Sequence, residues 1–157
     1  MDLERYYELR TLLLRWKSLL AENLRRKAEA SSQVLRRLHT LFEQEGSSEA
    51  FSDWLDLWCR QAAIQWILRV LFLRVLEDRG LLGAIRIRTG DGQRMWGQLS
   101  RNLGAASYLL WCCRDAAHLL PDLFGPTEFD FLLPDDDLMQ RFFDDGWRRP
   151  DSNREGW

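Results

Sequence analysis

Lysine is almost missing from this chain, because only Lys17 and Lys27 occur among 22 basic residues. A magnesium-dependent nuclease of the PD…(D/E)xK type needs metal-binding carboxylates with a lysine beside the attacking water. Pro121-Asp122 followed by Glu128-Phe129-Asp130 imitates the carboxylate half of that pattern, but Asp130 stands where the lysine is required. The sequence therefore excludes this nuclease class.

Cofactor-binding loops are missing as well. An amino-methyltransferase uses a glycine-rich loop and an Asn/Asp-Pro-Pro-aromatic loop that holds the flipped base. None of the three asparagines precedes a proline, no Pro-Pro pair occurs, and residues 90–92 (GDG) are typical of a turn. A Gly-Lys-Ser/Thr phosphate loop is also missing. We expect no catalytic residue, no bound cofactor and no small-molecule substrate in this chain alone.

Cysteine is scarce, with Cys59, Cys112 and Cys113 forming no CxxC pair. Cys112 and Asp115 near His118 suggest a metal cluster or a reactive thiol, but structural zinc typically needs four well-spaced ligands. Buried cysteine that packs as a small apolar side chain is the simpler interpretation, so we expect no metal site. The odd cysteine count and the lack of a charged-then-apolar leader favour a reduced, cytoplasmic setting.

Long apolar runs are limited to residues 64–76, where Arg69 and Arg74 interrupt the pattern. A helix needs about 20 apolar residues to cross a bilayer, so we expect no membrane partner. A helix that is apolar on nearly all sides is instead expected in a protein core.

The helical periodicity predicts an all-α fold, an irregular bundle of about four to six helices around a buried central helix at about 51–79. The chain has 157 residues, the length of one domain. We expect residues 1–143 to form one helical domain. Its expected elements are a long or broken helix at 1–45 with a possible break near Ser31-Ser32, the central helix at 48–79, a helix at 95–120, and a short helix at 134–143.

Two segments outside these helices have their own patterns. Ile85-Arg86-Ile87-Arg88 alternates as a strand does and a turn signal follows, so residues 84–94 are a possible short hairpin. Residues 144–157 are expected to be a polar tail or linker. Residues 121–157 hold four basic and ten acidic side chains, a net charge of −6.

Charged residues on or beside the apolar helix form a candidate structural cluster. Isolated buried charge costs several kcal/mol, so these side chains need partners. Arg74 and Asp78 have the i,i+4 spacing of a helical ion pair. The cluster comprises Arg69, Arg74, Glu77, Asp78 and Arg79.

Basic residues of the first segment are candidate DNA contacts, since phosphate binding relies on clustered arginine and lysine. The alternative is a solvated helix face whose charge is balanced by Glu22, Glu29 and Glu43. The candidates are Arg25, Arg26, Lys27, Arg36 and Arg37.

Three segments in order resemble the N-terminal regions of large adenine-specific DNA methyltransferases, both Eco57I-like restriction–modification enzymes and phage-growth-limitation (BREX-type) enzymes. Residues 68–82 (LRVLFLRVLEDRGLL) are similar to a helix of those regions, residues 123–125 with 129–143 are similar to a later segment, and residues 147–157 resemble the stretch before the catalytic core. The resemblance covers about residues 50–157.

This resemblance implies methyl transfer from S-adenosylmethionine to adenine N6 in phage defence, with the catalytic core outside these 157 residues. The chain is then a non-catalytic N-terminal helical domain or truncated fragment. Its expected partners are that core, DNA and other phage-defence proteins. The alternative is a free-standing helical interaction module with an acidic C-terminal surface that binds a basic partner.

Overall fold

The computed structural model describes residues 3–84, 86–101 and 103–147, and within them the chain is helical with no β-strand. The all-α prediction is thereby confirmed. These described residues form seven α-helices rather than four to six, since the 95–120 segment is divided and Pro121 starts an extra single turn. They are α1 (Leu3–Ala30), α2 (Ser32–Glu45), α3 (Phe51–Asp78), α4 (Asp91–Leu99), α5 (Ala105–Ala116), α6 (Pro121–Phe124) and α7 (Asp136–Phe142), followed by the π-helical turn η1 (Phe143–Trp147).

The first segment is broken at Ser31, which lies between α1 and α2 in an extended backbone conformation. The Ser31 hydroxyl accepts a hydrogen bond from the Val34 N–H at 3.3 Å and so caps α2. Gly46 ends α2 with a φ of 63°, a left-handed conformation that glycine adopts without steric cost. Ser31 therefore separates α1 from α2, and Gly46 ends α2 before α3 begins.

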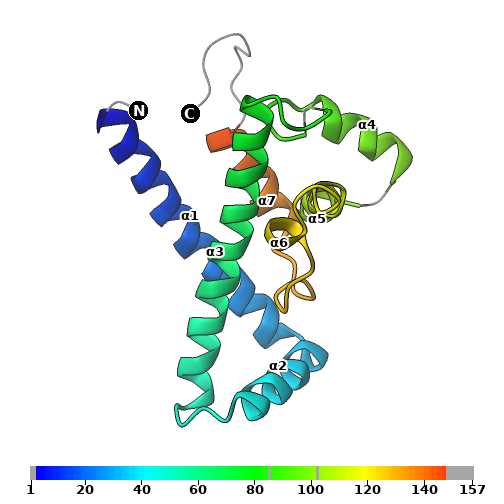
Figure 1. Cartoon of the computed structure of the whole chain (residues 1–157). Helices are drawn as coiled ribbons and strands as arrows, with labels where there is room; N and C mark the ends of the chain where they lie inside the picture. Colours follow the sequence, from blue (N-terminus) through cyan, green and yellow to red (C-terminus); the bar gives the residue numbers. More distant parts are fainter. Residues whose placement is uncertain (1–2, 85, 102, 148–157) are drawn as a thin grey trace.

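Helix α3 lies at the centre of the fold, where α1 crosses it and then diverges toward the N-terminus (Figure 1). Trp16, Leu20 and Leu24 of α1 are fully buried, as is Trp66 of α3. One face of α3 nevertheless remains uncovered. Several of its large apolar side chains are more than a third exposed, namely Leu57, Ile64, Leu68, Phe72 and Val75. The central helix is thus buried on most sides but not on all.

Residues 84–94 differ from the possible hairpin. The described part of this segment contains bends, and α4 already begins at Asp91. Backbone N–H groups of Arg86, Ile87 and Arg88 donate to the Glu77 carboxylate. Because a carboxylate takes the hydrogen bonds that a second strand would need, no strand pair forms there.

The single helix expected at 95–120 is also wrong, because α4 ends at Leu99 and α5 begins at Ala105. Gly104 precedes α5 in an extended conformation, with the Asp136 side chain packed against it. A side chain larger than glycine would collide with that carboxylate. The separation therefore follows from a tertiary contact with α7.

The C-terminal helix is close to its expected position, since α7 spans Asp136–Phe142 within the 134–143 segment. The π-helical turn continues the helical backbone to Trp147, so residues 144–147 of the expected polar tail are helical. Residues 148–157 of that tail lie outside the described residues. Among the helices the structure describes, none is both long and apolar enough to cross a membrane.

Candidate functional site

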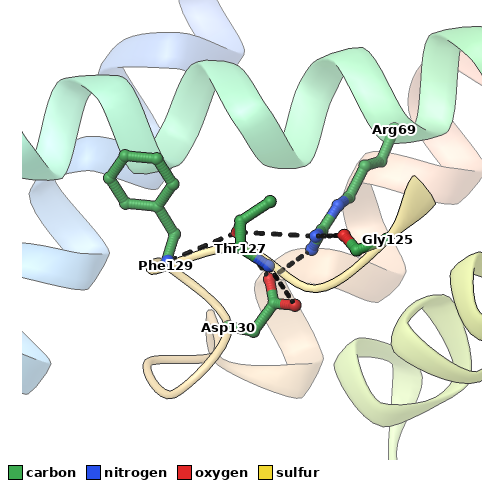
Figure 2. A network of polar contacts seen from close by, with 5 residues as sticks. All are labelled: Arg69, Gly125, Thr127, Phe129 and Asp130. Atoms are coloured by element: carbon green, nitrogen blue, oxygen red, sulfur yellow. Dashed lines mark hydrogen bonds and ion pairs between the residues drawn. The ribbon is translucent and has the colours of Figure 1, made fainter. Parts of the chain in front are cut away.

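Arg69 anchors the loop after α6 to the central helix. Its side chain is 1% exposed, and one guanidinium nitrogen donates to the Asp130 carboxylate at 2.6 Å. The other nitrogen donates to the Gly125 carbonyl at 3.2 Å (Figure 2). The guanidinium carbon of Arg69 also lies over the Trp66 ring, 5.0 Å from the ring centroid. These contacts pair the buried charge that the sequence left without a partner, although the buried Nε of Arg69 itself makes no hydrogen bond.

Asp130 is held by its own loop as well. The Thr127 N–H and hydroxyl donate to its two carboxylate oxygens at 3.1 and 2.9 Å (Figure 2). Burial acts to raise the pKa of Asp130, but the hydrogen bonds from Arg69 and Thr127 outweigh it and hold the pKa below the ordinary 3.8. A carboxylate that stays ionised and fully engaged acts as a structural anchor rather than as a general acid or base.

The remaining charged cluster divides into separate contacts. Arg74 donates from Nε to both Asp78 oxygens at 3.0 and 3.1 Å, which is the pair that their spacing predicts. Glu77 is 7% exposed and binds the Ile87 and Arg88 N–H groups at 2.6 and 2.8 Å. Burial raises the pKa of Glu77 above its ordinary 4.5, with the backbone donors opposing that change. Arg79, by contrast, is exposed just beyond the end of α3.

Basic candidates on α1 are engaged with acidic residues of the same chain. Arg25 lies 3.1 Å from Glu29 and 3.4 Å from Asp56. Lys27 and Arg26 approach the Asp135 carboxylate at 3.1 and 3.4 Å. These residues therefore join α1 to α3 and to the start of α7, and they present less free positive charge than the sequence pattern indicates.

The two basic candidates on α2, Arg36 and Arg37, lie in different environments. Arg37 lies over the Phe131 ring at 4.1 Å, so its guanidinium covers an aromatic side chain. Arg36 is exposed. The five basic candidates consequently do not gather into one free face that follows a phosphate backbone.

Asp135 makes contacts that the sequence pattern did not reveal. Asn23 of α1, which is 5% exposed, donates its amide to the Asp135 carboxylate at 2.7 Å and accepts from the Asp135 N–H at 3.0 Å. Hydrogen bonding by Asn23, followed by Lys27, lowers the pKa of Asp135 below 3.8. Asp136 in turn accepts from the Ala106 N–H at 3.0 Å and caps α5. Two of the three consecutive aspartates thus hold helices together.

Cysteines in the fold are buried and free. Burial raises the pKa of Cys59 and of Cys113 to about 12, and it raises the pKa of Cys112 as well. Such thiols remain protonated near neutral pH and are poor nucleophiles. Within the part of the chain that the structure describes, no three histidine, cysteine or acidic side chains are grouped to hold a metal ion.

A cavity of about 350 Å³ lies beside α5 and the end of α3. This volume is near the lower limit for ligand pockets. Its charged groups include Arg86 and Asp115, which bind each other at 2.9 Å. One oxygen of the Asp115 carboxylate is therefore engaged by Arg86.

The two long helices α1 and α3 each carry an exposed apolar surface. The first, which we call the α1 arm, comprises residues 3–15 of α1 and contains no buried residue. Its large exposed side chains are Leu3, Tyr6, Tyr7 and Leu14, with exposed fractions of 46–69%. The second, which we call the α3 stripe, consists of Leu57, Ile64, Leu68, Phe72 and Val75, with exposed fractions of 37–47%.

Comparison of the chain with protein-family models, with curated proteins and with solved structures found no match. The paired charges around α3 and the exposed apolar surfaces of α1 and α3 are the features of this molecule that bear on function.

Proposed function

We propose that this chain is a non-catalytic helical domain of a site-specific adenine-N6 DNA methyltransferase of phage defence, and that it binds the catalytic core through the α1 arm. The resemblance of residues 68–82 and the later segments to such enzymes supplies the enzyme class. The exposed α1 arm supplies the docking surface.

The α1 arm is the observation that carries the proposal. The arm is part of the 28-residue helix α1, and Leu9, Leu12 and Leu13 on one side of it pack against the core. Leu3, Tyr7 and Leu14 nevertheless lie exposed on this arm. Exposed apolar patches mark interaction sites on soluble proteins. A catalytic core packed against the arm would cover these side chains.

The charged residues within the motif support a structural role. Arg69, Arg74 and Glu77 each bind another part of the same chain. Their contacts fix the loop at 125–130, the end of α3 and the segment at 86–88. The charges of the motif therefore serve the fold, as expected of a domain that supports catalysis carried out elsewhere.

In this proposal the core binds S-adenosylmethionine and the target adenine, and the complex acts on DNA in the cytoplasm with other phage-defence proteins. Arg26, Arg36 and Arg37 are the exposed basic candidates for a supporting phosphate contact. Non-specific phosphate contacts of this kind are weakened by salt.

The alternative, a free-standing module with an acidic C-terminal surface, has less support. Asp135 and Asp136 are engaged by α1 and by the N-terminus of α5. Less of the acidic segment is therefore available to a basic partner, and we prefer the methyltransferase domain.

The test begins with the DNA that follows codon 157. We expect it to encode a polypeptide with a glycine-rich loop and an Asn/Asp-Pro-Pro-aromatic loop, and we expect that polypeptide to bind this chain in calorimetry. Tyr7→Glu and Leu14→Glu should each weaken binding at least about tenfold, since a charge would be buried in an apolar contact. Leu99→Glu, at another exposed apolar position, should leave it unchanged.

Neighbouring DNA without such a coding sequence would overturn the proposal. So would binding that is equally strong with the α1 arm variants and with wild type.

A further inference from the structure

We propose that the chain forms a two-fold symmetric dimer in which two copies of α3 pair antiparallel through the α3 stripe. This inference concerns a surface other than the α1 arm, and it does not rest on the methyltransferase proposal. The occupant of the stripe is a second copy of this chain.

The first argument is the spacing of the residues along the uncovered face of α3. Positions 57, 61, 64, 68, 71 and 75 follow one another at alternating steps of four and three, the spacing of a coiled-coil seam. Five of the six residues are apolar, and Gln61 is the exception. Leu71 is half-buried and packs against the core, and the other five are exposed. Phe72 of the α3 stripe lies next to this series rather than in it. At 1.5 Å per residue, the seam runs about 27 Å along the helix.

The second argument is that the seam is complementary to itself. An antiparallel pair centred on position 66 places Leu57 of one copy opposite Val75 of the other, and Ile64 opposite Leu68. The two-fold axis repeats each contact, as an isologous interface requires. Gln61 falls opposite Leu71, and one polar residue within a seam lowers affinity but helps to fix the register.

Charge at the two ends of α3 favours this orientation. Asp53 is exposed at the N-terminal end and Arg79 at the C-terminal end. An antiparallel pair brings Arg79 of one copy level with Asp53 of the other, whereas a parallel pair would bring like charges together at both ends. The helix dipoles also favour the antiparallel arrangement. The stripe and its ends therefore match a second α3 in one orientation.

The interface is short, so we expect weak, reversible dimerisation with a dissociation constant of about 10–100 µM. Sedimentation equilibrium of the 157-residue chain from about 1 to about 500 µM should follow a monomer–dimer equilibrium. Leu68→Glu should remove the dimer, because its charge would lie opposite Ile64. Tyr7→Glu, the matched control on the α1 arm, should dimerise as the wild type does.

The register has its own test. Asp53→Arg should weaken the dimer at least about threefold, and adding Arg79→Asp should restore it, since the swap recreates opposite charges at each end. Circular dichroism of every variant checks that the helices remain folded.

A chain that is monomeric at the highest concentration would overturn the proposal, as would a Leu68→Glu variant that dimerises normally. A dimer that the charge swap fails to restore would overturn the antiparallel register. Because these measurements use the chain alone and leave the α1 arm intact, their outcome is independent of binding to a catalytic core.

Discussion

The Asp130 carboxylate lies 2.6 Å from the guanidinium of Arg69, although 61 positions separate the two residues in sequence. Arg69 is 1% exposed and Asp130 is 20% exposed, so the pair is shielded from water on the arginine side. Through this pair the loop at 125–130 is fixed to the central helix.

Asp130→Ala is expected to lower the free energy of unfolding by about 3 kcal/mol, because it leaves the charge of Arg69 buried and unpaired. Arg69→Met should cost less, since an apolar chain of similar length removes the charge itself. Urea denaturation measures both. As a control, exposed Asp137→Ala should stay within about 0.5 kcal/mol of wild type. A loss below about 1 kcal/mol for Asp130→Ala would contradict the anchoring role.

The same carboxylate predicts a dependence on pH. Its pKa in the fold is below the ordinary 3.8 of the unfolded chain, so the stabilisation is fully present above about pH 4 and is lost as pH falls through the lowered value. The stability difference between wild type and Asp130→Asn should therefore shrink as pH falls below about 4. Urea midpoints measured at steps from neutral to acid pH check this. A constant difference would show that Asp130 does not titrate in this way.

Glu77→Gln is expected to release the segment at 86–88. One amide oxygen cannot replace the two carboxylate oxygens that accept from the Arg86, Ile87 and Arg88 N–H groups. Buried donors without acceptors cost about 1–3 kcal/mol, so stability should fall by about that amount. Hydrogen exchange at Ile87, which is fully buried, should accelerate more than tenfold, or about 1.4 kcal/mol. Glu43→Gln on the exposed face of α2 should leave that exchange unchanged.

Gly104→Ala is expected to act through Asp136. An added methyl group would meet the Asp136 carboxylate, which must then move and release the Ala106 N–H. Loss of such a cap typically costs about 1 kcal/mol, the cost also expected for Asp136→Ala. Because both substitutions remove one contact, the double variant should be no less stable than the worse single variant. Additive losses in thermal denaturation would argue against this coupling.

Helix class and several boundaries follow from local chemistry, and the sequence predicts them well. The apolar periodicity specifies the helices, and Ser31 and Gly46 end them through their own side-chain or backbone properties. The division of 95–120 depends instead on Asp136, which lies 30 or more positions away. The bends at 86–88 depend likewise on Glu77. Local patterns do not contain such distant partners, so these two features were predicted incorrectly.

The partners of the buried polar side chains were likewise not predictable from local sequence patterns. The buried setting of Arg69 implies a carboxylate partner, but several aspartates and glutamates are equally compatible with the sequence. In the sequence, Asp130 was notable only because it occupies the position where the nuclease pattern requires a lysine. In the fold it forms an ion pair with Arg69. Asn23 carried no signal, because a single asparagine in a charged helix is indistinguishable from a solvated residue. Only the approach of α7 gives it a role.

The hydrogen bonds between Asn23 and Asp135 join residues that are 112 positions apart, whereas α1, α2 and α3 follow one another directly along the chain. During synthesis at about 5–20 residues per second, the crossing of α1 and α3 has both partners available seconds before Asp135 leaves the ribosome. We therefore expect the crossing of α1 and α3 to form before the Asn23–Asp135 contact, which joins α7 to helices that are already packed.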